Sequence, residues 1–151
     1  MTLREIIEQF NEVYEGEPWF GNSISTYLQE ISPEMVSTRM NSGHSIGQII
    51  AHMIVWRNYT IEKLKGEDLK IKLGSDEDWA NQEFNAENKT ELYSQFKSTQ
   101  KTLNQLLNAQ NDSLLNEQVP GEKFNFHTLL VGLVQHDIYH LGQIYLLKSS
   151  R

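Results

Sequence analysis

The stretch Gly132-Leu-Val-Gln-His136-Asp-Ile-Tyr-His140-Leu-Gly-Gln-Ile144 places two imidazoles, His136 and His140, four residues apart in a segment that is helical in pattern. A helix advances about 100° per residue, so the two rings share one face, one turn apart. Apolar residues of the same helix bracket them, at Leu129, Leu133, Ile144 and Leu147. Both rings are therefore expected to point inward. Two buried imidazoles need partners, and a divalent metal is the simplest one to share, although separate hydrogen bonds in a core would also serve.

Composition limits the classes of protein to which the chain can belong. Its 151 residues are enough for one domain, residues 1–151. A balance of 13 Lys+Arg against 20 Asp+Glu, a net charge of −7, argues against partners such as nucleic acid or an anionic membrane. The absence of cysteine excludes disulfides and Cys-ligated zinc. No secretion signal or membrane-spanning apolar run of about 20 residues is evident, so the expected location is cytoplasmic.

Apolar residues at helical spacing predict four amphipathic helices, the first of which Gly16 and Pro18 kink or divide into two pieces. Their ranges are about 3–31, 46–65, 90–108 and 127–148. The patterns Thr2-x-x-Glu5 and Ser45-x-x-Gln48 are capping boxes that predict where the first and second helices begin.

The segment 67–88 shows no helical pattern, and its alternating Leu69, Ile71 and Leu73 suggest at most a short extended piece without a partner strand. The predicted fold class is therefore all-α, a four-helix bundle with a long connection between helices two and three.

A third metal ligand must come from upstream, and His52 lies inside the apolar run of the second helix. His52 on one helix facing His136 and His140 on another gives three nitrogens on one side of a metal, with a position left for water or substrate. Zinc, nickel, iron and manganese all suit imidazole ligands. Alternatively, His52 is a core histidine that bonds to a backbone carbonyl or a side chain. His44 in a loop and His127 on the opposite helix face stay outside the predicted metal set.

Neighbouring residues are candidates for holding substrate or supporting the ligands. Gln143 lies one heptad after His136 and is expected to orient substrate or water, or to be an ordinary buried amide. Asp137 can orient an imidazole, although a surface charge or an interhelical salt bridge is favoured. Trp56, on the second helix, is a further candidate for contacting substrate or supporting a metal ligand. All three tryptophans are expected to pack in the core or at its rim. Gly132 leaves room beside the metal or permits close helix packing.

Two other metal motifs are weaker matches. His136-Asp-x-x-His140 differs from the His-Glu-x-x-His of zinc proteases, because Asp is one methylene shorter than the Glu base. A di-iron carboxylate bundle needs Glu-x-x-His on two helices, and no Glu here has His three residues later.

Several motifs together resemble the DinB/YfiT-like proteins of the DinB superfamily. The last helix, Gly132 to Ile144, resembles theirs closely, and Ile49-Ile-Ala-His52-Met-Ile-Val-Trp56 resembles their second helix. The step Trp19-Phe-Gly-Asn-Ser23 also fits, and the likeness is weakest between residues 67 and 125.

The resemblance implies a four-helix bundle that binds a divalent metal through three histidines, which match His52, His136 and His140 here. Some relatives are S-transferases or isomerases that use low-molecular-weight bacterial thiols such as bacillithiol or mycothiol, many have no known activity, and homodimers are common. The expected function is a metal-dependent thiol S-transferase or hydrolase acting on a small-molecule substrate. The alternatives are a non-catalytic metal-binding protein of the stress response and a plain small-molecule-binding bundle whose histidines fill the core.

Overall fold

The computed structural model describes residues 1–150, which form five α-helices and no strand. The helices are α1 (Leu3–Glu15), α2 (Ile24–Glu30), α3 (Ile46–Leu64), α4 (Lys89–Asn108) and α5 (Phe126–Ser149). Three short 3₁₀ helices lie in the connections, namely η1 (Pro33–Ser37), η2 (Ala86–Asn88) and η3 (Asp112–Asn116). The prediction of an all-α fold is confirmed, and the predicted first helix is two separate helices.

The helices begin where side chains satisfy the free backbone amides of the first turn. Both predicted capping boxes are present, with Thr2 and Glu5 at α1 and Ser45 and Gln48 at α3. Gly66 follows α3 with φ of +88°, a conformation that L side chains rarely adopt, and this explains why the helix ends there.

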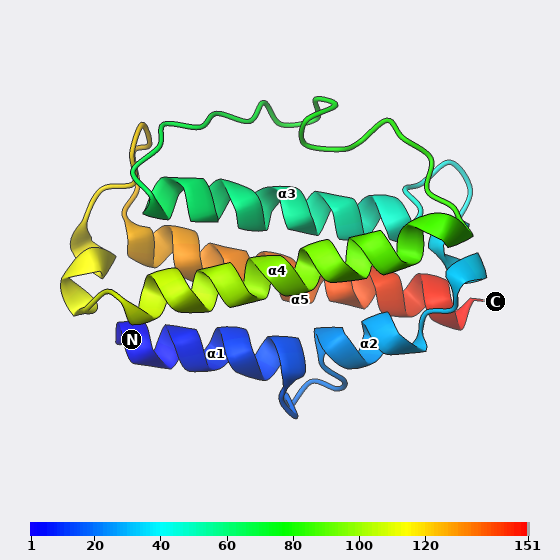
Figure 1. The fold of residues 1–151 in the computed structure, drawn as a ribbon, viewed down its shortest axis with the longest axis horizontal. Coiled ribbons are helices and arrows are strands. Elements are labelled where there is room, and N and C mark those ends of the chain that lie inside the picture. Colours follow the sequence, from blue (N-terminus) through cyan, green and yellow to red (C-terminus); the bar gives the residue numbers. More distant parts are fainter. Residues whose placement is uncertain (151) are drawn as a thin grey trace.

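The helices lie side by side along the long axis of the molecule (Figure 1). α1 and α2 follow one another along one side, α3 lies on the opposite side, and both α1 and α3 pack against α4 and α5. The core between them is made of apolar side chains that are almost completely buried, including Phe10, Ile50, Phe96, Leu103 and Leu130. Because α5 contacts both α1 and α3, it buries residues on more than one face.

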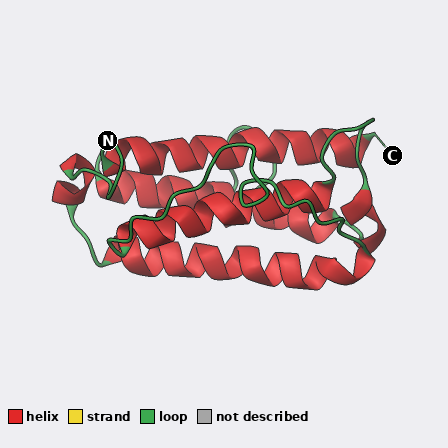
Figure 2. Ribbon diagram, turned by 90° about the horizontal axis from the view of Figure 1, so that it is seen from above, coloured by secondary structure: helices red, strands yellow, loops and turns green. Residues whose placement is uncertain are grey.

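The connection between α3 and η2 runs along the outer side of α3 (Figures 1 and 2). The Gln48 side chain on α3 donates hydrogen bonds to the backbone carbonyls of Ala80 and Gln82 and so ties the end of the connection down. Leu69 and Leu73 are exposed, so the alternating pattern buries no face and forms no strand.

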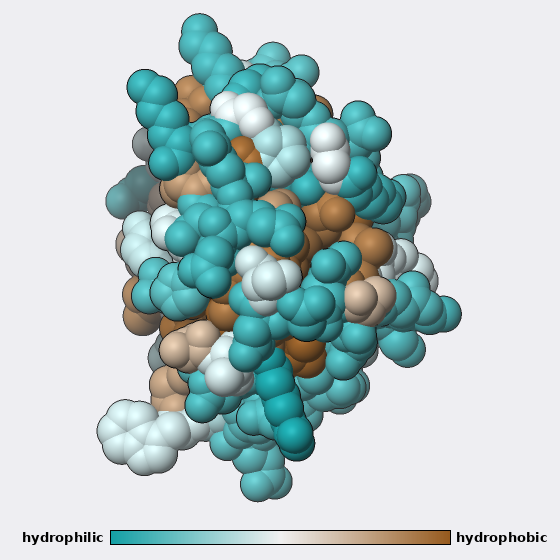
Figure 3. All heavy atoms as spheres, turned by 90° about the vertical axis from the view of Figure 1, so that its left-hand side faces the viewer, coloured by the Kyte–Doolittle hydropathy of each residue, from teal (hydrophilic) through white to brown (hydrophobic). Residues whose placement is uncertain are grey.

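The surface is mostly hydrophilic at the end of the molecule shown in Figure 3, with apolar side chains visible between the polar ones. The Trp19 side chain is fully exposed in the α1–α2 connection, so the expectation that it packs in the core or at its rim is wrong. Across residues 1–150, no helix combines the length and the apolar character that a membrane span requires.

Candidate metal centre

Three imidazoles meet between α3 and α5, as the sequence predicts. His52 comes from α3, and His136 and His140 come from successive turns of α5. The Nε2 atom of His136 lies 3.1 Å from Nε2 of His52 and 3.1 Å from Nε2 of His140. Each ring offers one nitrogen to a group in which all three lie within 4.8 Å of one another. His44 and His127 are not members of this group.

Hydrogen bonds at the far side of two rings decide which nitrogen carries the proton. Nδ1 of His52 lies 2.9 Å from the carbonyl oxygen of Asp78, and a carbonyl can only accept, so His52 donates through Nδ1–H. Nδ1 of His140 donates to Oε1 of Gln143 at 2.7 Å. Both rings therefore present an unprotonated Nε2 to the centre of the cluster.

The donor set fits a divalent cation better than it fits a hydrogen-bonded core. A single proton on His136 Nε2 can be shared with one neighbour only, which leaves the other pair of nitrogens as two lone pairs 3.1 Å apart. The buried Nδ1 of His136 has no hydrogen-bond partner among the described residues. Two nitrogens bound to one tetrahedral zinc at its usual bond length lie about 3.3 Å apart, close to the spacing here. The three Nε2 atoms thus form a group that a metal suits.

Burial lowers the pKa of all three imidazoles from their ordinary value. The pKa of His136 falls to about 3, first because of burial and then because of the neighbouring His140 and His52. The carbonyl of Asp78 and the amide of Gln143 act in the opposite direction on the pKa of His52 and His140, respectively. The rings are therefore neutral at pH 7, which is the form that binds a metal.

Asp78 supports His52, and the sequence analysis did not identify it. Its Oδ1 lies 3.1 Å from His52 Nδ1 and accepts the indole N–H of Trp56 at 2.8 Å, while Oδ2 accepts the backbone N–H of Gly74. Asp78 is only 4% exposed, unlike its exposed acidic neighbours Asp76 and Glu77. Nothing in the sequence separates these three carboxylates, because the connection has no periodicity.

Gln143 and Trp56 both lie beside the histidine cluster. Gln143 contacts His140 directly, and Trp56 reaches His52 through the carboxylate of Asp78. That Gln143 or Trp56 contacts substrate stays a prediction.

Asp137 has a different place from the one expected of a residue that orients a ligand. It is 1% exposed, which excludes a surface charge, and its Oδ2 accepts hydrogen bonds from the Arg57 guanidinium at 2.8 and 3.0 Å. The interhelical salt bridge that the sequence favoured is therefore present. The carboxylate holds α5 to α3 and orients none of the three imidazoles.

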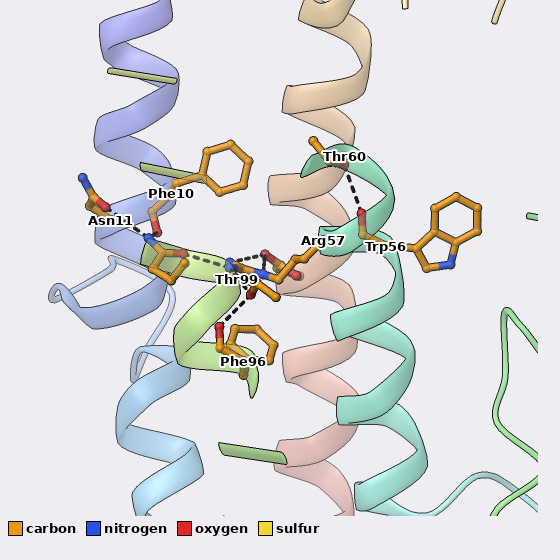
Figure 4. A network of polar contacts seen from close by, with 9 residues as sticks. Phe10, Asn11, Trp56, Arg57, Thr60, Phe96 and Thr99 are labelled. Atoms are coloured by element: carbon orange, nitrogen blue, oxygen red, sulfur yellow. Dashed lines mark hydrogen bonds and ion pairs between the residues drawn. The ribbon is translucent and has the colours of Figure 1, made fainter. Parts of the chain in front are cut away.

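Arg57 extends this ion pair to α4. Its side chain is completely buried and also donates to Thr99 and Gln100, and Gln100 in turn donates to Asn11 of α1 (Figure 4). In the same view Trp56 points away from Arg57, although the two residues are adjacent in the chain. The stretch 52–57 of α3 thus contributes His52 to the histidine cluster and Arg57 to the polar network of the core.

An indole from the connection covers His52. Trp79 stacks on the His52 ring with a centroid distance of 3.7 Å and nearly parallel planes, and His44 stacks on the opposite face of Trp79 at 3.8 Å. His44, which the sequence left without a role, therefore closes a three-ring stack at the edge of the site. Trp79 is partly buried against the core, so the expectation that it packs in the core or at its rim is confirmed.

A cavity of about 200 Å³ opens beside His136, between α3 and α5. Its walls include Trp56, Phe124, Leu129, Leu133 and Gly132. A Cβ atom added at Gly132 would meet no atom within 4 Å, so this glycine leaves open space rather than permitting close helix packing.

Comparison with known proteins identifies a family for the chain. No curated protein matches the chain. The model of the DinB family matches residues 7–148, which include all five helices in whole or in large part and all three histidines of the cluster. The chain therefore belongs to the DinB family.

Proposed function

We propose that the protein is a divalent-metal-dependent enzyme whose metal is held by His52, His136 and His140. The observation that carries this proposal is the convergence of three Nε2 atoms. In two of the rings, His52 and His140, the proton is on Nδ1, so Nε2 is free to bind a metal. No carboxylate belongs to the group among the described residues, so the donor set is the three-nitrogen set of catalytic zinc sites, which keep a position for water or substrate.

A divalent metal, when bound, supplies Lewis-acid chemistry that lowers the pKa of a thiol or a water molecule. The residues of this chain perform the positioning. Asp78 and Gln143 keep the protons of His52 and His140 on Nδ1, so that both Nε2 atoms stay free, and Trp79 fixes the plane of His52 by stacking.

The reaction we propose is thiol S-transfer to an electrophilic small molecule, with hydrolysis as the second reaction type. In S-transfer the thiol sulfur bonds to the electrophilic carbon, the leaving group departs with its electron pair, and the thiol proton passes to solvent. The thiol cofactor, of the bacillithiol or mycothiol type, rests on the family resemblance, and zinc, nickel, iron and manganese are all candidates for the metal. The small-molecule substrate is supported by the cavity beside His136.

The proposal also includes the number of arms in the helix bundle. If α1 and α2 together form one arm, the fold is a four-helix bundle with a long connection between the second and third arms. A homodimer and a cytoplasmic location complete the proposal, and light scattering of the purified protein measures the first of these.

Metal analysis of purified protein after loading and buffer exchange tests the site. We expect about one equivalent of a transition metal in the wild type and less than about a tenth of that in His136→Ala, because loss of one of three ligands removes much of the affinity. His127→Ala is the matched control, since His127 lies on the same helix outside the cluster. Equal metal content in both variants would show that the histidines only fill the core.

Activity is tested by a screen of thiols against electrophilic substrates, with and without the metal. Metal-dependent turnover that His136→Ala abolishes supports the enzyme. Stoichiometric metal without any turnover across the screen would favour the non-catalytic alternative.

A further inference from the structure

The cavity beside His136 has walls that select for a particular chemistry. Trp56 and Phe124 contribute aromatic surfaces, and Leu129 and Leu133 contribute alkyl groups. No charged side chain of the described part of the chain lines it.

We propose that this cavity binds a neutral, single-ring aromatic group of the substrate, and that Gly132 sets the size of ring it accepts. The inference rests on the proposed function for the reaction that follows binding, while the binding itself needs only the cavity.

The polar groups of the cavity argue for a neutral ligand. The Thr60 hydroxyl donates to the backbone carbonyl of Trp56, and the Thr128 hydroxyl lies 3.0 Å from the Asn125 side-chain oxygen. Both hydroxyls already have partners within the chain. His136 also lines the cavity, and without a bound metal a carboxylate placed there would lose its hydration and gain no charged partner, which costs free energy.

The size and the aromatic walls argue for a ring. An apolar cavity of about 150 Å³ binds benzene, so the cavity here, at about 200 Å³, has room for one ring with a small substituent. The Trp56 and Phe124 rings offer faces and edges to such a group, and aromatic pairs in tilted or offset arrangements gain energy beyond the burial of area.

Gly132 is the position at which the chain leaves this space open. Gly132 lines the cavity, and an added Cβ there meets no atom within 4 Å, so a larger side chain has room to occupy part of this space. Gly142 provides a matched control, because it lies on the same helix, is exposed, also has open space around its Cβ position, and is not part of the cavity wall.

The test is a titration of the full chain with toluene and, separately, with benzoate, which has a similar ring but carries a charge. Methyl resonances of ¹³C-labelled Leu129 and Leu133 report binding, and the titration is run both with zinc and with a chelator. We expect saturable shifts with toluene in both conditions and, in the presence of the chelator, affinity weaker by about tenfold or more for benzoate. Gly132→Leu should weaken toluene binding by about tenfold or more, and Gly142→Leu should leave it unchanged.

Gly132→Ala is the second variant, because it adds one methyl group to open space within a helix and favours folding. It should weaken toluene binding in the same direction by a smaller factor. The inference is overturned if toluene gives no saturable shift, if benzoate binds equally well in the presence of the chelator, or if neither Gly132 variant differs from Gly142→Leu. Since toluene binding is measured without metal, its failure is separate from a failure to bind zinc, which would overturn the proposed function instead.

Discussion

At the scale of single residues, the proton positions of two of the three imidazoles, His52 and His140, depend on groups at their outer edges. Asp78 is the most informative of these, because it contacts His52, Trp56 and the backbone of Gly74 at once. A residue that orients a metal ligand typically contributes 10–100-fold to metal affinity. Asp78 therefore belongs to the site even though it is not one of the three nitrogen donors.

Replacing Asp78 by Ala tests this role. We expect zinc affinity to fall by about 10–100-fold with the helical content retained, because the backbone carbonyl still holds His52 Nδ1 while the carboxylate contacts are lost. Competition with a chelating dye measures the affinity. Asp76→Ala is the control at an exposed neighbour, and an equal loss in both variants would show a general effect of negative charge instead.

The lowered pKa of His136 predicts how the metal-free protein responds to acid. The folded value of about 3 lies below the ordinary value of 6.5, so the unfolded chain binds more protons between these pH values. Stability should therefore decrease as the pH falls below about 6.5, and this ring should contribute no pH dependence above that value. Thermal midpoints at pH 7.5 and 5.0 in the presence of a chelator measure the effect.

His136→Asn removes the titrating group from this comparison. The variant should lose less stability than the wild type between the two pH values. A drop as large as that of the wild type would mean that other groups cause the acid sensitivity.

At the scale of elements, the buried pair of Arg57 and Asp137 links α3 to α5. The same two helices carry the histidine cluster, so the ion pair and the cluster are two separate links between α3 and α5. Burial raises the pKa of Asp137, whereas the Arg57 guanidinium lowers it. The Arg57 charge and its hydrogen bonds are what favour an ionised carboxylate in the core.

Asp137→Ala should lower the free energy of unfolding by about 3–5 kcal/mol, because it leaves a guanidinium buried without its counter-charge. Urea denaturation measures this loss. The control is Glu8→Ala, which removes an exposed ion pair with Arg4 and should cost less than about 1 kcal/mol. A similar small loss for Asp137→Ala would mean that Thr99 and Gln100 satisfy Arg57 without the carboxylate.

At the scale of the whole molecule, the cluster joins the two halves of the chain, since His52 and His136 are 84 residues apart. A metal that binds only the folded state adds stability by mass action. Binding and folding are thus linked across the α3–α5 interface.

Free zinc at 100 times its dissociation constant should stabilise the protein by about 2.7 kcal/mol, a rise in thermal midpoint of several degrees for a domain of this size. Calorimetry with zinc and with a chelator measures the shift. His52→Ala should abolish it, and His127→Ala should retain it. The same shift in all three proteins would place the zinc somewhere other than the histidine cluster.

The amino-acid sequence by itself determined the helices, their caps and the pairing of His136 with His140, because capping and the 3.6-residue period are local properties of the chain. It also placed His52 on an apolar face. Only the tertiary structure decided that Asp78 and Trp79 reach His52 and that Asp137 pairs with Arg57. The physical reason is that the connection has no periodicity and that the rotation of one helix against another depends on packing across the core, which no local pattern records.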